Sequence, residues 1–184
     1  MVALKDDELQ APPHLTIDTL TSHAESTSST LLYALLSMLS LPSDTLSHAA
    51  SHIGVTQTFA TLIRGLPFHA SRGRMIIPAE ITAKHGVNQE GVFRLASEGP
   101  RSKGEAADGN KKGLEDAVFE FATVANDHLI TARDMFKETA GKVPVEGMPV
   151  FLSGVRIILG IPYLLLTKYV YRSPSRTSSN VWKK

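Results

Sequence analysis

The chain has 184 residues, a length typical of one domain with a hydrophobic core, and a fifth of them are charged. It carries 19 basic and 18 acidic residues, but Gly147 to Lys184 holds six basic residues and no acidic one, so the rest of the chain is acidic. The absence of cysteine excludes disulfides, thiolate metal sites and a cysteine nucleophile. Because the basic tail has few aromatic residues and the body is acidic, we expect no nucleic-acid partner.

The first 15 residues predict an irregular N-terminal segment, because the consecutive residues Pro12 and Pro13 oppose helix formation. Asp6, Asp7 and Glu8 are atypical of import presequences, which are poor in acidic residues, and no apolar run of signal-peptide length is present. We therefore expect no targeting segment in this chain. The protein is then either cytosolic or its chain lacks its natural beginning.

Helical periodicity begins after this segment. Apolar residues at steps of three and four predict a first helix from about Thr16 to Leu39. Ser43 or Asp44 can cap a second helix, which we expect to end near Arg64 because Pro67 follows. One face of that second helix is predicted to be buried and consists of Leu46, Ala49, Ala50, Ile53, Ala60 and Ile63.

The second half of the chain predicts two further helices. Asn88 can cap a short one, whereas the glycine-rich and charged residues 98–113 predict a flexible loop. Apolar residues at helical spacing from Leu114 to Phe136 predict a longer helix. Since no stretch alternates apolar and polar residues for long, we predict an all-α class, with one helical domain at 16–170 and a basic disordered tail at 171–184.

An apolar segment at 150–170 precedes that tail. A membrane-spanning helix needs about 20 mostly apolar residues, but Arg156 and Lys168 limit the uncharged run to the eleven residues Ile157–Thr167, which Pro162 interrupts. We expect that this segment does not span a bilayer. It is either an ordinary buried last helix or a peripheral contact with membrane lipid through residues 150–176, whose basic side chains would meet anionic headgroups.

Four residues form a candidate interaction surface: His48, His52, Lys84 and His85. His48 and His52 have the i, i+4 spacing that zinc proteases use, but the glutamate of that motif and a third ligand are missing. We therefore predict no metal site and expect the two histidines to cap the helix or to form local hydrogen bonds.

A second group of side chains is cationic. Arg64, Arg72 and Arg74 could bind a phosphate group, or they could form a solvated rim at a helix end, where cations complement the helix dipole. Neither a phosphate-binding loop nor a G-x-S-x-G nucleophile motif is present. The residue pattern alone leaves both interpretations of the arginines open.

The stretch from His52 to Pro78, HIGVTQTFATLIRGLPFHASRGRMIIP, resembles the second signature of the squalene and phytoene synthase family. That signature runs Leu-Gly, then a helix ending in Arg-Asp-x-x-x-Asp, then Gly-Arg-x-x-x-Pro. The matching positions are Ile53-Gly54, Arg64, Gly73-Arg74 and Pro78. The resemblance implies the all-α isoprenoid-synthase bundle, of which this chain would be a C-terminal portion, truncated at its N-terminus.

In that family the two aspartates hold Mg²⁺ against the diphosphate of a prenyl substrate. The corresponding residues here are Gly65 and His69, neither of which suits a hard cation. Since Pro67 should end the helix, we also expect the two positions not to share a helical face. The resemblance therefore implies a vestigial diphosphate and metal site, without cofactor or bound metal, at Arg64, Gly65, His69, Arg72 and Arg74.

Several stretches between about Thr19 and Arg133 resemble the non-catalytic mitochondrial branch of this family, the complex I assembly factor 6 branch. This resemblance implies a protein on the matrix side of the mitochondrial inner membrane. It would bind complex I subunits or other assembly factors, contact inner-membrane lipid through residues 150–176, and catalyse no reaction. One alternative is an active prenyl synthase of squalene or phytoene type whose first aspartate motif is missing from this chain. Another is a peripheral membrane protein of unrelated role.

Overall fold

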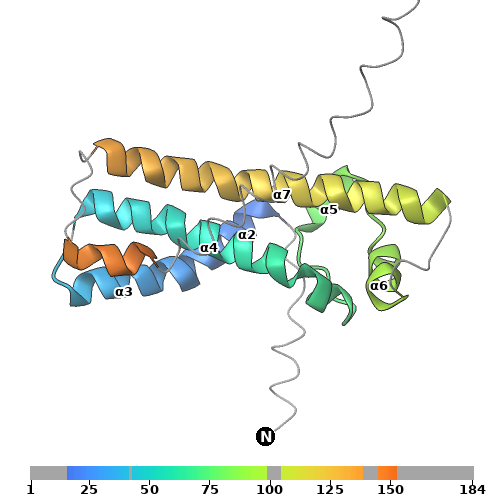
Figure 1. Ribbon diagram of the computed structural model, residues 1–184, viewed down its shortest axis with the longest axis horizontal. Coiled ribbons are helices and arrows are strands. Elements are labelled where there is room, and N and C mark those ends of the chain that lie inside the picture. The colour runs from blue at the N-terminus through green and yellow to red at the C-terminus, as the bar shows by residue number, and fades with distance from the viewer. Residues whose placement is uncertain (1–15, 42, 99–104, 139–144, 153–184) are drawn as a thin grey trace, which may run out of the picture.

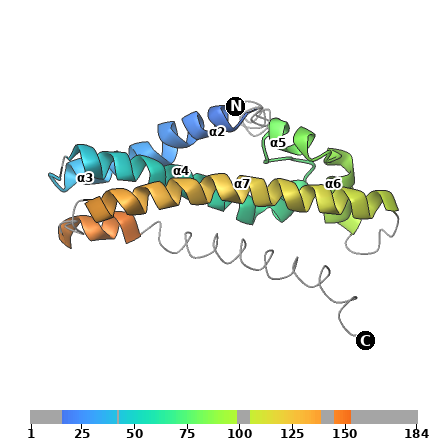
Figure 2. The ribbon, with the colours of Figure 1, turned by 90° about the horizontal axis from the view of Figure 1, so that it is seen from above.

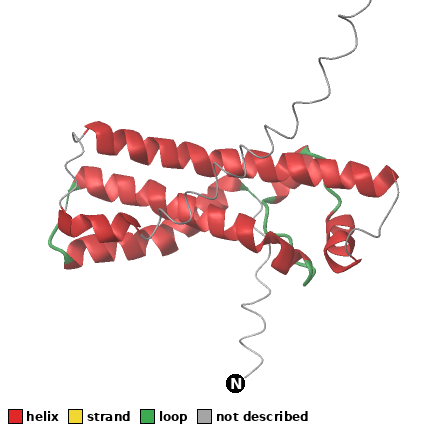
Figure 3. Ribbon diagram, in the orientation of Figure 1, coloured by secondary structure: helices red, strands yellow, loops and turns green. Residues whose placement is uncertain are grey.

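The computed structural model describes residues 16–41, 43–98, 105–138 and 145–152. In chain order these residues form α2 (Ile17–Ala24), the π-helical turn η1 (Glu25–Ser29), α3 (Thr30–Met38), α4 (Asp44–Ala70), α5 (Ala79–Lys84), α6 (Gln89–Glu98), α7 (Glu105–Glu138) and the 3-10 turn η3 (Val145–Gly147). Residues 148–152 are again helical. No strand occurs within the described ranges (Figure 3), and the predicted all-α class is confirmed.

Two long helices, α4 and α7, lie side by side and run in opposite directions along the length of the molecule (Figures 1 and 2). α2, η1 and α3 pack against α4, whereas α5 and α6 pack against α7. The predicted helix at 114–136 is therefore confirmed as part of α7, which contributes one half of the central helix pair.

The core consists of two apolar clusters that both lie between α4 and α7. The larger one is centred on the stacked rings of Phe59 and Phe121, whose centroids are 4.8 Å apart. The smaller one joins α3, the first half of α4 and the end of α7 to Phe151. The predicted inner face of α4 is confirmed, because all six of its residues are buried: Leu46, Ala49, Ala50, Ile53, Ala60 and Ile63.

The first predicted helix is confirmed, but the π-helical turn η1 divides it into α2 and α3. At this turn the backbone of Ser29 closely approaches Gly54 of α4: a Cβ on Gly54 would lie 2.7 Å from the Ser29 Cα. Ser29 Oγ donates a hydrogen bond to the Ser51 carbonyl oxygen (3.0 Å), and Thr30 Oγ1 donates to the Glu25 carbonyl oxygen (3.0 Å). These contacts hold the widened turn against α4.

The predicted end of the second helix near Arg64 is wrong, because α4 continues through Pro67 to Ala70. Proline removes one N–H donor from a helix and usually breaks it. Here the hydrogen bonding resumes after Pro67, whose carbonyl oxygen accepts from the Ser71 N–H (3.1 Å). Leu66 and Ala70 are buried while Pro67 is exposed, so apolar burial on the opposite face offsets the missing bond.

The predicted flexible loop at 98–113 is also wrong over most of its length, because α7 begins at Glu105. Asn110 binds the start of α6 twice: its Oδ1 accepts from the Asn88 N–H (2.7 Å) and its Nδ2 donates to the Asn88 carbonyl oxygen (3.1 Å). The predicted cap of α6 is confirmed, since Asn88 Oδ1 accepts from the Glu90 N–H (3.0 Å). These contacts stabilise turns of α7 that carry little apolar surface.

Some predictions lie outside the described residues. They concern the irregular segment at 1–15, the apolar segment beyond residue 152 and the tail at 171–184. Among the helices that the structure describes, none is both long and apolar enough to cross a membrane.

Candidate functional site

The candidate site is built on the last turns of α4 and the turn that follows. The carbonyl oxygen of His69 accepts hydrogen bonds from the N–H groups of Arg72 (3.0 Å) and Arg74 (2.9 Å). Gly73 has a φ of 69°, a left-handed conformation that glycine adopts without strain and that ends the helix. After the turn, Met75, Ile77 and Pro78 are buried, so the chain is anchored in the larger cluster.

The three predicted arginines all lie exposed on this part of the molecule. The guanidinium carbon of Arg72 lies 3.7 Å from the centroid of the Phe68 ring, and Phe68 is itself 56% exposed. A stacked guanidinium keeps its in-plane N–H donors available for an anion. None of the three arginines forms an ion pair with an acidic residue of the described part of the chain. The site therefore presents uncompensated positive charge.

The prediction that Gly65 and His69 do not share a face is wrong. Because α4 is continuous, the two positions are one turn apart, and a Cβ on Gly65 would lie 3.2 Å from the His69 Cδ2. The His69 ring is half-buried and meets the Phe68 ring edge-on, with 5.4 Å between centroids. The backbone thus places positions 65 and 69 on one face of α4, but neither residue has a carboxylate side chain.

No group of three or more histidine, aspartate or glutamate side chains within the described ranges is placed to hold a metal ion. Arg64 and Arg74 carry the wrong charge for a metal ligand, and Gly65 has no side chain. An imidazole such as that of His69 prefers softer metals than Mg²⁺. The site can therefore attract anions but offers no set of oxygen ligands for a hard cation.

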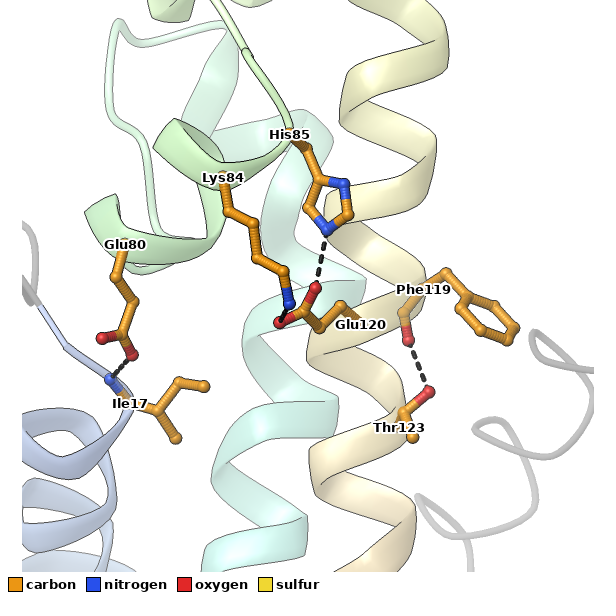
Figure 4. Close-up of polar contacts among 7 residues, drawn as sticks. All are labelled: Ile17, Glu80, Lys84, His85, Phe119, Glu120 and Thr123. Atoms are coloured by element: carbon orange, nitrogen blue, oxygen red, sulfur yellow. Dashed lines mark hydrogen bonds and ion pairs between the residues drawn. The ribbon is translucent and has the colours of Figure 1, made fainter.

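Lys84 and His85, predicted as part of an interaction surface, connect α5 to α7 (Figure 4). Lys84 Nζ lies 2.8 Å from Glu120 Oε1, and His85 Nε2 lies 2.7 Å from Glu120 Oε2. The hydrogen bonds from Lys84 and His85 lower the pKa of the Glu120 carboxyl group. α5 is also joined to the start of α2, because Glu80 accepts a hydrogen bond from the Ile17 N–H. Sequence reasoning missed Glu120, whose acceptor role depends on the position of α5.

His48 and His52 lie on the same face of α4, with ring centroids 5.0 Å apart and ring planes tilted by 36°. The expectation of a local hydrogen bond is wrong for His52, because its side-chain partner is on α7: the Nδ1 atoms of His52 and His128 are 2.8 Å apart. Burial lowers the pKa of both rings, and His128 and His48 lower that of His52 further. His128 was not predicted, although it is seven residues after Phe121 and therefore on the buried side of α7.

The fold and the site together define an all-α protein with three exposed arginines and with no carboxylate at positions 65 and 69, which lie one turn apart on α4. The model of the squalene/phytoene synthase family matches residues 3–161, and the chain belongs to this family. This match covers most of the chain and supports the resemblance of residues 52–78 to the second signature of that family.

Individual relatives of this chain have names that are more specific than the family. The chain is 32% identical over 153 residues to NADH dehydrogenase (ubiquinone) complex I, assembly factor 6, of Rattus norvegicus, and 33% identical over 153 residues to that of Homo sapiens. Both alignments cover 83% of this chain and 41% of the relative. The homolog of Drosophila melanogaster is 36% identical over 136 residues, which are 74% of this chain and 36% of that protein. The chain thus spans less than half the length of these relatives. No solved structure matches it.

Proposed function

We propose that this protein is a non-catalytic assembly factor for respiratory complex I that acts in mitochondria, on the matrix side of the inner membrane. The observation that carries the proposal is the pair Gly65 and His69, in positions that share a face of α4 but offer no carboxylate. The names of the relatives support the assignment to complex I assembly.

The chemistry of prenyl transfer explains why the site argues against catalysis. A departing diphosphate needs its negative charge stabilised, and metal ions do this when carboxylates fix them in place. Arg64, Arg72 and Arg74 could attract an anion, but they cannot bind Mg²⁺. The exposed cations are therefore what remains of the site, and we assign to them contact with acidic groups of complex I subunits or other assembly factors.

Membrane contact belongs to the same proposal. Only Val150, Phe151 and Leu152 of the segment 150–176 lie within the described residues, and there Leu152 is 59% exposed. The six basic residues from Gly147 to Lys184, with no acidic residue among them, favour a surface with anionic lipid. The association is peripheral in this proposal.

The assignment is tested in cells of the source organism from which the gene has been removed. We expect a loss of assembled complex I on native gels, restored by the wild-type protein and restored less by a variant with Arg64, Arg72 and Arg74 all changed to Glu. The matched control variant changes the exposed residues Lys111 and Lys112 to Glu. Normal amounts of complex I in the deletion strain would refute the function.

The absence of catalysis is tested separately on the purified protein. Incubation with farnesyl or geranylgeranyl diphosphate and Mg²⁺ should give no product of squalene or phytoene type. Turnover above a control without enzyme would overturn this part of the proposal and favour a prenyl synthase.

A further inference from the structure

A polar layer crosses the bundle between the two apolar clusters. It consists of Ser29 from η1, Ser51, His52 and Thr56 from α4, and His128 from α7. Thr56 Oγ1 donates to the carbonyl oxygens of His52 (2.9 Å) and Ala125 (3.2 Å), so it connects α4 to α7. Within the described residues no buried side-chain nitrogen or oxygen lacks a hydrogen-bond partner. The buried polar side-chain atoms of the layer are thus all paired.

The pairing of the two histidines depends on their protonation. At 2.8 Å, one Nδ1 must carry a hydrogen and the other must present a lone pair, so at least one ring is neutral. If both rings are protonated, both Nδ1 atoms carry hydrogens, so the bond is lost and two N–H groups face each other. Two positive rings would then lie with centroids 5.1 Å apart inside a half-buried contact. Like charges at this distance repel strongly where water is partly excluded.

The surroundings offer little to neutralise this charge. From α4, His48 faces His52, and a second positive charge there would add to the repulsion. From η1 the Glu25 carboxylate and from α7 the Asp127 carboxylate favour the charged forms, but both side chains are exposed and neither is hydrogen-bonded to His52 or His128. α3 contributes no charge, because residues 26–43 contain no charged residue and no histidine. From the apolar side, the Phe59 ring lies edge-on to His128.

We propose that the His52–His128 pair is an acid-sensitive latch between α4 and α7, closed while one of the rings is neutral and opened by the second proton. Opening separates the helices at the polar layer, where Thr56 and Ala125 also join them. The end of the bundle with the smaller apolar cluster then loses the hydrogen bond that joins it to α7 at His128.

The direction of the pH dependence follows from burial. Desolvation lowers the pKa of both rings in the folded protein below the ordinary value of 6.5. The unfolded chain therefore binds more protons in mildly acidic solution, and stability falls as the pH decreases. The stabilisation by the neutral pair is fully present above about pH 6.5 and is lost as the pH falls through the lower, folded-state pKa values.

The test compares the full chain with His128→Asn, which retains a polar group near the Nδ1 position but cannot become charged. Urea unfolding is measured at pH 7.5, 6.5 and 5.5. We expect the wild type to lose stability towards pH 5.5 and the variant to lose less than half as much. His23→Asn, on the exposed surface of α2, is the matched control and should keep the full wild-type loss. An equal loss in His128→Asn and wild type would overturn the proposal.

A second measurement decides the matter if His128→Asn fails to fold. Histidine ring signals of the wild-type chain are followed by NMR between pH 8 and pH 5. His52 and His128 should titrate below pH 6.5 and as a coupled pair, with signals of Thr56 and Ala125 shifting in the same range. Independent titration of the two rings, without any change at Thr56 and Ala125, would refute the latch.

Discussion

Replacement of Gly54 by alanine should separate the first helical segment from α4. A Cβ at this position would lie 2.3 Å from Ser29 Oγ, 2.6 Å from Ser29 N and 2.7 Å from Ser29 Cα. The hydroxyl group could rotate away, but the two backbone atoms belong to the π-helical turn. Since ordinary contact begins near 3.4 Å, η1 must move as a unit.

The size of the effect follows from three terms. Overpacking of a tight contact costs about 1–3 kcal/mol, and the upper end applies because backbone atoms are involved. Movement of η1 also weakens the hydrogen bond from Ser29 Oγ to the Ser51 carbonyl oxygen, which contributes roughly 1 kcal/mol. Alanine in a helix gains about 1 kcal/mol over glycine. We therefore expect Gly54→Ala to lower the free energy of unfolding by about 2–3 kcal/mol.

The assay is urea unfolding at pH 7.5, followed by circular dichroism. Gly109→Ala is the matched control, because Gly109 also lies in a helix but a Cβ there would meet nothing within 4 Å. The control should be stabilised by about 0.5–1 kcal/mol. If Gly54→Ala is also stabilised, the close approach of η1 and α4 is wrong.

Two further substitutions test polar contacts. Glu120→Gln should cost roughly 1 kcal/mol at pH 7, because its partners Lys84 and His85 lose a charged acceptor at a partly exposed site. Those partners lower the pKa of the Glu120 carboxyl group, so its stabilisation is present above the ordinary value of 4.5 and is lost as the pH falls through the lower, folded-state pKa. The difference between the thermal unfolding curves of variant and wild type should therefore shrink as the pH is lowered from 5 to 3. A constant difference down to pH 3 would contradict this account. Asn88→Ala should cost about 1 kcal/mol in urea unfolding because it removes the cap of α6. Ser43→Ala is its control and should change little, since Ser43 makes no side-chain cap bond to α4; equal losses would argue against the Asn88 cap.

The parts of the fold that apolar periodicity defines could be predicted from the sequence. The inner face of α4 and the course of α7 from Leu114 onward follow from residues at steps of three and four, and burial confirms both. Asn88 was recognised as a cap because its side chain acts on residues next to it in sequence. A side chain that caps its own helix and a regular spacing of apolar residues can both be recognised from the sequence alone.

The errors arose where distant contacts override local preference. Pro67 opposes a helix locally, but the burial of Leu66 and Ala70 keeps α4 intact. The first turns of α7 are rich in glycine and charge, and Asn110 stabilises them by binding Asn88. The partner of His52 is 76 residues away, so its spacing to His48 could not reveal it.

The continuity of α4 through Pro67 makes one further prediction about the candidate site. In the double variant Gly65→Asp/His69→Asp, two carboxylates would stand one turn apart on the same face, and removal of the His69 ring would leave them room. Without metal their repulsion should cost a few tenths of a kcal/mol. Carboxylate oxygens suit Mg²⁺, and a dissociation constant of about 1 mM would give about 1.4 kcal/mol of stabilisation at 10 mM Mg²⁺.

Thermal unfolding with and without 10 mM Mg²⁺ measures this effect. The wild type and the single variant Gly65→Asp are the controls, and neither should respond, because neither holds two carboxylates at the site. A Mg²⁺-dependent gain confined to the double variant would show that positions 65 and 69 share a helical face and that two carboxylates there suffice to bind Mg²⁺. No gain would mean that the helix is interrupted at Pro67, as the usual effect of proline on a helix predicts. Positions 65 and 69 would then not face the same side, and two carboxylates there could not bind one cation together.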